Sequence, residues 1–341
     1  MEFTTGGRLE VRISPDDVGK RVSVRRLDEA GAPGAKFADT VGVLTSWDSG
    51  VLTITRRDGE SVRIAESSLV AGKVVPAAPA RRRGPAATFE ELARVCARAW
   101  QPVESEPLGE WLLRAAGGFT RRANSALPLG DPGMPVGAAL ERVREWYAAR
   151  GLPAYVQVAT GAEGTQELLA AELERCGWFR EVTAQVRIAA LAPIGDLDAD
   201  VSRVRIVRAC DAGWLARYQR FEEPGPHVTK VLASGPSVWF ASVPGGGEVP
   251  AAGDGGGEVP AAIGRCVVDG RWAGFMAVEV DPAYRRQGLA SAVMTALARQ
   301  ALDEGASAAW LQVEDDNDGA RALYDGMGFA THHSYHHFRP A

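Results

Sequence analysis

No run of about eighteen apolar residues, the length that a membrane-spanning helix needs, occurs in this 341-residue chain. The first residues also lack the basic start and apolar centre of a secretory signal peptide. We therefore expect a cytoplasmic protein that makes no use of a membrane.

Cysteine is scarce, and no two cysteines form a Cys-x-x-Cys pair. The four are Cys96, Cys176, Cys210 and Cys266. Such wide spacing argues against a disulfide framework and against a cysteine-based zinc site. We expect these thiols to act as small buried apolar groups.

A strong excess of charge is absent as well. The chain has 38 Lys and Arg against 43 Asp and Glu, and its net charge of −5 provides no general attraction to nucleic acid. Hydrophobic residues make up 46% and charged residues 24%, which is ordinary for a globular protein. A length of 341 residues exceeds one ordinary core, so two or three domains are expected.

Residues 1–75 contain about five short segments in which apolar and polar side chains alternate, and no helix is predicted there. Asp58-Gly59, between two of these segments, is a strong signal for a tight hairpin. The pattern predicts a small all-β barrel that is similar to an SH3-like module. Its slight basic excess leaves nucleic-acid binding open, although packing or docking of a partner is favoured.

Residues 76–87 are rich in Pro and Ala and predict a semi-extended linker. Thr88, three residues before Glu91, has the spacing of a helix capping box. From there to Ile188 the pattern predicts helix, two strands, helix, strand, helix and strand. The two strands are predicted over 110–116 and 121–127, with the polar stretch 117–125 set between their apolar parts. This polar stretch is interpreted either as the lining of an acceptor site or as an exposed hairpin.

The most informative stretch begins at Phe275. Phe275 to Val280 reads as a strand, and Pro282 stops it because proline cannot donate to a sheet. A basic loop with Gly288 follows, and apolar residues at helical spacing begin at Leu289. The first amides of a helix have no partner within the helix and attract anions, so the stretch predicts a phosphate site.

Two motifs carry a resemblance to a known family. The first is Arg285-Arg-Gln-Gly288-Leu-Ala290, preceded by Val278-Glu-Val280-Asp-Pro282. The second consists of Asn317, Ala320, Leu323-Tyr324 and Gly328-Phe329. One helix and one strand separate the two motifs. In this order they resemble the GNAT superfamily of acyl-CoA-dependent N-acyltransferases.

The resemblance implies roles for these residues with acetyl-CoA as the cosubstrate. The CoA pyrophosphate would sit on the loop and the helix start, at Arg285, Arg286, Gln287, Gly288, Leu289, Ala290 and Ser291. The backbone of Val278 and Val280 would bond to the pantetheine arm like an added strand, and Asn317 would reach the same arm. Tyr324 would lie beside the sulfur and protonate the leaving thiolate; the alternative is an aromatic of the core. No metal is implied.

The general base is a separate question, with Glu279 as the first candidate. Strand alternation points Glu279 away from the face of Val278 and Val280 unless a bulge redirects it. Other positions where the family carries Glu hold Trp272-Ala-Gly274 and Gln312 here. Glu314 and Asp315 are the backups. The tail histidines at 332, 333, 336 and 337 alternate between strand faces, which disfavours a metal cluster.

The middle segment follows a GNAT-like order but has no recognisable phosphate loop. We therefore expect an α/β protein with a mixed sheet, made of tandem GNAT-like domains of which the first is degenerate. The expected boundaries are 1–75 for the barrel, 76–87 for the linker, 88–196 for the degenerate domain and 203–341 for the catalytic domain. This layout resembles actinobacterial tandem-GNAT proteins.

The expected activity is direct transfer of an acetyl group to a primary amine, in a ternary complex. The acceptor is a small molecule or a basic protein, nucleic acid is disfavoured, and the oligomeric state is left open. The alternatives are an acyl-CoA sensor or scaffold without turnover, and docking of nucleic acid or a partner through the barrel.

Overall fold

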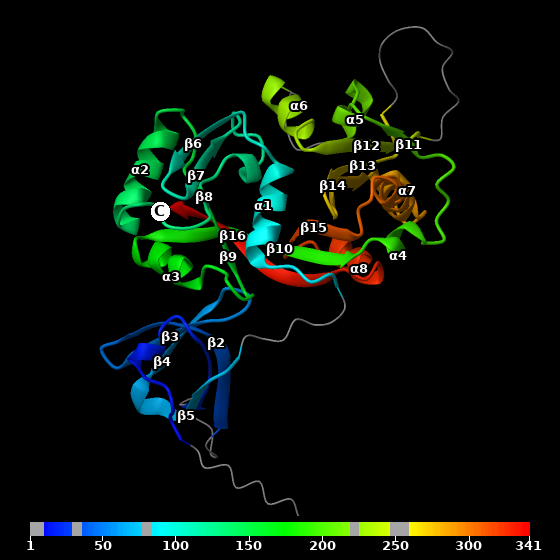
Figure 1. The fold of residues 1–341 in the computed structure, drawn as a ribbon. Coiled ribbons are helices and arrows are strands. Elements are labelled where there is room, and N and C mark those ends of the chain that lie inside the picture. Colours follow the sequence, from blue (N-terminus) through cyan, green and yellow to red (C-terminus); the bar gives the residue numbers. More distant parts are fainter. Residues whose placement is uncertain (1–9, 29–35, 77–83, 219–224, 246–258) are drawn as a thin grey trace, which may run out of the picture.

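The computed structural model describes residues 10–28, 36–76, 84–218, 225–245 and 259–341 (Figure 1). A small β module is followed by two α/β halves that lie side by side. Within the described residues, no helix combines the length and apolar character needed to cross a membrane.

The N-terminal module is one five-stranded antiparallel sheet in the order β4-β3-β2-β1-β5. Its elements are η1 (Pro15–Asp17), β1 (Arg21–Asp28), β2 (Lys36–Asp48), β3 (Val51–Thr55), β4 (Ser61–Ala65), η2 (Glu66–Ser68) and β5 (Leu69–Val74). The small all-β module is confirmed, and the likeness to an SH3-like barrel stays a prediction. The first alternating segment, expected as a strand over 9–13, contributes a single bridge from Val11 to Gly72 among its described residues, and β5 is the fifth strand instead.

The predicted hairpin at Asp58-Gly59 is confirmed, and it contacts the rest of the protein. Gly59 has a φ of +84° and donates its N–H to the carbonyl of Arg56. Arg57 donates to the carbonyl of Thr331 at 3.1 Å, and the Ser61 hydroxyl lies 3.4 Å from a carboxylate oxygen of Glu174. The tip of the module therefore contacts both halves.

The first half contains the predicted helices. Its elements are α1 (Phe89–Arg98), β6 (Glu104–Leu108), β7 (Trp111–Ala115), η3 (Arg121–Ala123), β8 (Leu127–Pro128), α2 (Val136–Ala148), β9 (Val156–Thr160), α3 (Glu167–Arg175), β10 (Trp178–Ala190) and α4 (Ala192–Gly195). The Thr88 hydroxyl accepts the N–H of Glu91 at 3.1 Å, as its spacing predicts. The second predicted strand, over 121–127, is wrong: η3 and the two-residue β8 occupy this region.

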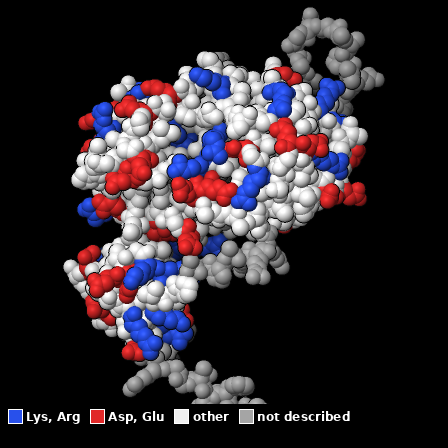
Figure 2. Space-filling view, viewed as in Figure 1, with Lys and Arg blue, Asp and Glu red and all other residues white. Residues whose placement is uncertain are grey.

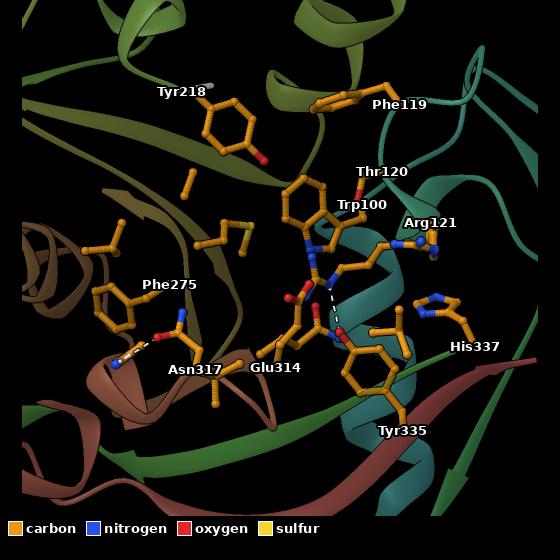
Figure 3. Close-up of a pocket in the computed structure, with 18 of the residues that line it drawn as sticks. Trp100, Phe119, Thr120, Arg121, Tyr218, Phe275, Glu314, Asn317, Tyr335 and His337 are labelled. Carbon is orange, nitrogen blue, oxygen red and sulfur yellow. Dashed lines mark hydrogen bonds between the residues drawn. The ribbon is translucent and has the colours of Figure 1, made fainter. Parts of the chain in front are cut away.

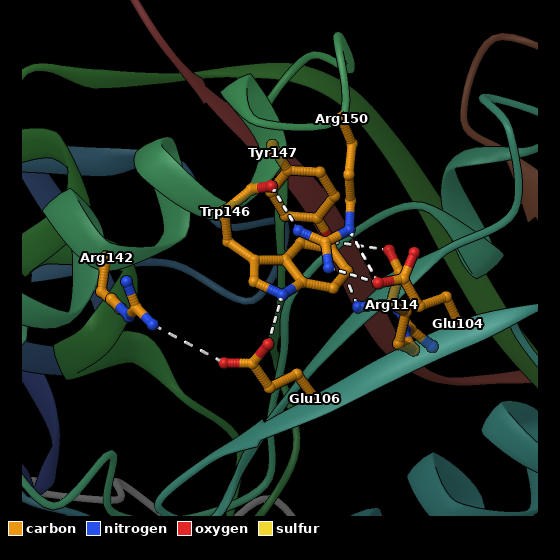
Figure 4. Close-up of polar contacts among 7 residues, drawn as sticks. All are labelled: Glu104, Glu106, Arg114, Arg142, Trp146, Tyr147 and Arg150. Atoms are coloured by element: carbon orange, nitrogen blue, oxygen red, sulfur yellow. Dashed lines mark hydrogen bonds and ion pairs between the residues drawn. The ribbon is translucent and has the colours of Figure 1, made fainter.

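Helix α2 is fixed to the sheet of the first half by polar contacts (Figure 4). The Trp146 indole donates to Glu106 at 2.8 Å, and the Tyr147 hydroxyl donates to the carbonyl of Arg114 at 2.8 Å. Arg150 stacks on the Trp146 ring at 3.5 Å and pairs with Glu104. These contacts hold α2 rigidly against β6 and β7.

The second half contains the predicted acyl-CoA motifs. Its elements are β11 (Arg205–Val207), α5 (Ala212–Arg217), α6 (Pro226–Leu232), β12 (Ser237–Val243), β13 (Ala262–Asp269), β14 (Trp272–Val280), η4 (Pro282–Tyr284), α7 (Leu289–Asp303), β15 (Ala308–Glu314), α8 (Asp318–Gly326) and β16 (Ala330–Pro340).

The two halves share a sheet through an exchange of strands. The eight-stranded order is β11-β12-β13-β14-β15-β10-β16-β9. Strand β10 of the first half lies between β15 and β16, and β16 of the second half lies between β10 and β9. In Figure 1 the red strand β16 runs out of the second half, so that the C-terminus lies inside the first. Each half thus supplies a strand to the other.

A hydrophobic cluster follows the exchanged strands across the boundary between the halves. It joins Trp100 at the end of α1 to Trp272, Trp310 and Tyr335, each at most 3% exposed. Full burial of a large apolar side chain contributes roughly 1.5–3 kcal/mol, so this cluster is a major contribution to stability. The core continues under the candidate site.

Candidate active site

The site begins where β14 and β15 separate. The two strands pair in parallel only from Trp272 to Phe275, opposite Ala308 to Leu311. Beyond Phe275, β14 stays paired with β13 on its other side as far as Val280. Among the described residues, one edge of β14 therefore has no strand partner from Met276 onward, and an extended ligand could add to it.

A bulge interrupts β14 at this separation. Its register against β13 shifts between Ile263 and Arg265, and Ala277 has a φ of +52°. An extra residue in one strand reverses the alternation of the side chains that follow. Glu279 lies two residues past Ala277 and lines the cavity at this position. Strand alternation alone would point Glu279 away from the site unless a bulge redirected it, and the structure has such a bulge.

The predicted phosphate loop leads into α7 without a side-chain cap. Arg285, Arg286, Gln287 and Gly288 are exposed, and Leu289, Ala290 and Ser291 are half-buried. Gly288 is the N-cap with a φ of +77°, and the first helical bond of α7 runs from Ala292 to Gly288. The amides of residues 289–291 thus point out of the helix end, as an anion site requires.

The end of β14 is held by an ion pair. Asp281 accepts the N–H of Ala283 at 2.8 Å and pairs with Arg217 of α5 at 2.5 Å. The backbone hydrogen bond and this guanidinium hold the pKa of the Asp281 carboxyl below its usual range. The contacts fix the chain direction just before the basic loop.

Helix α8 brings the second motif to the same place. The Asn317 side chain caps α8 by accepting the N–H of Ala320 at 3.1 Å, and it lines the cavity. Tyr324 follows Asn317 by seven residues, about two turns farther along the same face of the helix. It lines the same cavity and packs edge-to-face on Phe329 with 5.9 Å between ring centroids. Burial raises the pKa of Tyr324 to about 12, so the phenol stays protonated at neutral pH.

These elements border a cavity of about 460 Å³ between the halves (Figure 3). Phe275 and Asn317 lie on one side, and Thr120, Arg121 and His337 lie on the opposite side. Of the residues predicted for the site, Val278, Glu279, Asn317 and Tyr324 line this cavity. Val280 and the loop of 285–291 lie farther along the same strand and helix.

The far wall is the polar stretch 117–125, held in shape by Asn124. The Asn124 amide oxygen accepts the N–H groups of Ala116 and Gly118 at 2.7 and 3.0 Å. Its amide nitrogen donates to the carbonyls of Phe119 and Thr120 at 2.5 and 3.0 Å. This side chain is 5% exposed. The stretch is therefore a fixed loop that presents residues 118–122 to the cavity.

Replacing Asn124 tests that account. We expect Asn124→Ala to lower the free energy of unfolding by about 2–4 kcal/mol, because four backbone groups lose their partner and two of these hydrogen bonds are buried. Urea unfolding followed by fluorescence measures the change. Asn124→Asp keeps the acceptor, but its second oxygen faces the carbonyls of Phe119 and Thr120, so its loss should be at least as large. A stability unchanged within about 0.5 kcal/mol in Asn124→Ala would contradict the account.

The carboxylates near the cavity divide into two groups. Glu279 and Glu314, at the end of β15, line it. Asp315 instead accepts a hydrogen bond from Gln185 at 2.7 Å and is outside the cavity lining. Gln312, at a position where the family carries Glu, also lines the cavity. The structure thus brings the first candidate base and one of its two backups to the site.

The tail histidines are part of the shared sheet. His336 lies between the hydroxyls of Thr160 and Thr183, at 2.9 and 2.8 Å from its two ring nitrogens. His332 contacts the carbonyl of Ala87 and the ring of His333. His337 alone of the four lines the large cavity. Three of them have packing positions in the core or at its border.

Comparisons with known proteins identify the family of this chain. Residues 87–338 match a family model described as the C-terminal part of the probable histone acetyltransferase Rv0428c. The chain belongs to this family. It is an N-acetyltransferase of the GNAT type, as the two motifs predict.

Two curated relatives span most of this family member. A probable histone acetyltransferase from Mycobacterium tuberculosis is 28% identical over 327 residues, covering 94% of this chain and 95% of the relative. The N-acetyltransferase YobR from Bacillus subtilis is 27% identical over 262 residues, covering 74% of this chain and 98% of the relative.

A solved structure supports the tandem architecture. The tandem GNAT protein from the clavulanic acid biosynthesis pathway superposes with a TM-score of 0.51 at 14% identity, covering 76% of this chain and 90% of its own. At this identity the likeness shows the fold alone. The predicted mixed α/β fold with tandem GNAT halves is confirmed.

Several cavity residues were missed by sequence reasoning. They are Trp100, Pro153, Tyr155, Val182, Tyr218, Tyr335 and His337. Most are contributed by the first half or by the exchanged strand β16, where no motif marks them. The signal in the sequence for this wall is the polar run at 117–125, for which the lining of an acceptor site is one of the two interpretations given above.

Proposed function

We propose that this N-acetyltransferase moves the acetyl group of acetyl-CoA to a primary amine by direct attack in a ternary complex. One observation carries the proposal: the open edge of β14 and Tyr324 of α8 meet at one cavity, and the uncapped start of α7 lies farther along the chain from the same strand. The acceptor amine would enter from the side of the first half.

The residues present fit acetyl-CoA. The backbone amides of residues 286–291 and the side chains of Arg285 and Arg286 would hold the pyrophosphate. The backbone of Val278 and Val280 would bond to the pantetheine arm along the open strand edge. Asn317 uses its oxygen to cap α8, which leaves its amide N–H groups for the same arm.

The reaction needs one base and one acid. Glu279 would accept a proton from the ammonium form of the acceptor, so that a neutral amine attacks. The amine nitrogen forms a bond to the acetyl carbon while the bond from that carbon to sulfur breaks. Tyr324 would give its proton to the departing thiolate, and the proton that the attacking nitrogen loses as it becomes an amide would return the phenol to its protonated form. A strand amide would hold the thioester oxygen, an oxyanion-type contact.

The acceptor class is an amine in a protein or in a small molecule. The M. tuberculosis relative is named as a probable histone acetyltransferase, which makes lysine in a basic protein one member of the class. Nucleic acid is a weaker candidate, since acidic and basic side chains are interspersed on the face shown in Figure 2.

Release of free CoA, screened over amines, amino acids, peptides and basic proteins, tests the proposal. The absence of acceptor-dependent CoA release would count against it.

The base can be assigned by a pair of variants. We expect Glu279→Gln to lower kcat by about 100-fold near neutral pH, within the usual range for loss of a general base. Glu314→Gln is the matched variant at the other carboxylate of the cavity. The kcat of both is measured across a pH series. A larger loss in Glu314→Gln than in Glu279→Gln would transfer the role of base to Glu314.

Gly288 allows a direct test of the phosphate loop. A Cβ at Gly288 meets no atom within 4 Å, but its φ of +77° disfavours any L-residue. We expect Gly288→Ala to raise the KM for acetyl-CoA about tenfold, the effect of about 1.4 kcal/mol, with little change in kcat. Gly305→Ala is the matched control, since Gly305 follows α7 with a φ of +90° and equally open space. Equal KM values in the two variants would refute the loop assignment.

A further inference from the structure

Arg122 is a half-buried cation on the wall of the cavity. Its Nε donates to the Tyr335 hydroxyl at 2.9 Å, and its guanidinium carbon lies 5.7 Å from the Trp100 ring centroid. In the described part of the chain, no carboxylate forms an ion pair with it. Its neighbour Arg121 differs, because a carboxylate oxygen of Glu181 lies 3.3 Å away.

Arg122 keeps its charge in this position. Burial disfavours the cation, but the hydroxyls of Tyr335 and Tyr218 and the carboxylate of Glu314 outweigh burial and raise the pKa of the guanidinium. Among the described residues Glu314 forms no ion pair with Arg122, so the half-buried cation has no anion in direct contact, an arrangement that costs free energy. The place that faces Arg122 is the cavity.

His337 adds a second unpaired polar group to the same wall. It is 3% exposed, and neither ring nitrogen has a hydrogen-bond partner among the described residues. In Figure 3 its ring lies below Arg121 at the edge of the cavity. Burial and the nearby arginines hold the pKa of His337 well below its usual range, so the ring is neutral. A neutral imidazole can donate one hydrogen bond to a ligand and accept another.

The cavity therefore has two kinds of charged group. Arg122 carries positive charge on the wall supplied by the first half. Glu279 and Glu314 carry negative charge at the ends of β14 and β15. A ligand that matches both has an ammonium group and a carboxylate within one small molecule.

We propose that the acceptor is a small amine that bears a carboxylate, of the amino-acid class, bound with its carboxylate on Arg122 and with His337 as a hydrogen-bonding partner. The inference rests on the proposed function and names its substrate class. A lysine inside a polypeptide has its own α-carboxyl in a peptide bond, so it cannot supply this carboxylate. The cavity volume of about 460 Å³ is in the range of small-molecule sites.

Matched pairs of amines test the proposal in the full-length protein. Lysine with cadaverine, ornithine with putrescine, and β-alanine with ethylamine each differ by one carboxylate. We expect the carboxylate-bearing member of at least one pair to have a kcat/KM at least tenfold higher. Arg122→Gln should abolish that preference and raise the KM of this acceptor tenfold or more, while the KM for acetyl-CoA changes less than twofold.

Two variants act as controls. Arg122→Lys keeps the charge and should retain part of the preference. Arg142→Gln removes an exposed arginine of α2, outside the cavity lining, and should behave as the wild type. Calorimetric binding of each amine gives a second readout that does not depend on turnover.

Three outcomes would overturn the proposal. In the first, no carboxylate-bearing amine binds or reacts better than its partner. In the second, a lysine-rich peptide reacts better than every such amine, which indicates a polypeptide acceptor. In the third, Arg122→Gln changes only the preference between acetyl-CoA and succinyl-CoA, which places Arg122 at the acyl group. Failure of the proposed function is recognised separately, as a lack of acetyl-CoA binding. Because calorimetry measures amine binding without turnover, the comparison of the amine pairs still decides this inference.

Discussion

Replacing Tyr324 with phenylalanine is expected to lower kcat by about 100-fold and to leave the KM for acetyl-CoA nearly unchanged. The loss follows from removal of the proton donor to the thiolate, a step whose contribution is typically 100-fold or more. The Tyr324 phenol lines the cavity, and burial raises its pKa to about 12, so it is available in the protonated form. Steady-state rates of CoA release measure the effect.

The phenylalanine variant isolates the hydroxyl. The edge-to-face contact between residue 324 and Phe329 is kept, so the melting temperature should change little. If kcat is preserved in Tyr324→Phe, another group or water protonates the thiolate and Tyr324 is an aromatic of the core. If Glu279→Gln is also fully active, the proposed chemistry at this end of the cavity is wrong.

We expect the free energy of unfolding to decrease as the pH is lowered, already at pH values where carboxylates remain ionised. Burial lowers the pKa of His333 and His336 to about 3, and it also lowers that of His337. In the unfolded chain these histidines titrate near 6.5. Below that value the unfolded state binds more protons than the folded state, so stability falls as the pH falls from about 6.5 toward 3.

The expected size of this effect is large. At pH 5 each of His333 and His336 should remove about 2 kcal/mol, or about 4 kcal/mol together, against a typical stability of 5–15 kcal/mol. For a chain of this length, that corresponds to a melting temperature about 6 °C lower at pH 5 than at pH 7. Charged groups near these rings add to the penalty. They are Arg180 beside His336, and Arg114, Arg121 and Arg122 around His337.

Calorimetric melting at pH 7 and pH 5 measures the difference. His336→Gln should reduce the difference, because Gln can still bond to the Thr160 and Thr183 hydroxyls and does not titrate. His227→Gln, at an exposed position, should leave it unchanged. Equal melting temperatures at the two pH values would mean that the buried rings gain protons without opening the fold. Carboxylates with lowered pKa, such as Glu181, contribute only at lower pH, below about 4.5.

The second half could be predicted closely because its signals are local. The strand end at Pro282 and the helix start after Gly288 each depend on a few neighbouring residues, and each lies where its pattern indicated. The orientation of Glu279 could not be settled in the same way. It depends on the bulge at Ala277, which arises from register against β13 and has no signature in the strand itself.

The far wall of the cavity was beyond local reasoning for the same reason. Arg122 reaches the site because Asn124 folds its loop and because Tyr335 arrives on a strand from the other half. The sequence predicts a strand over 178–188, but it does not predict that this strand pairs with β15. Pairings between residues more than a hundred positions apart are determined by the whole fold, and no short window of sequence records them.

The exchange of β10 and β16 limits how this protein could be shortened or could diverge. Deletion of the first half would remove β10 and leave β15 and β16 with unsatisfied backbone groups and exposed edges. Removal of the second half would leave β9 and β10 in the same state. The first half is thereby kept as an obligate folding partner. Mutations can then adapt its loops to an acceptor while the strands that secure it remain under constraint.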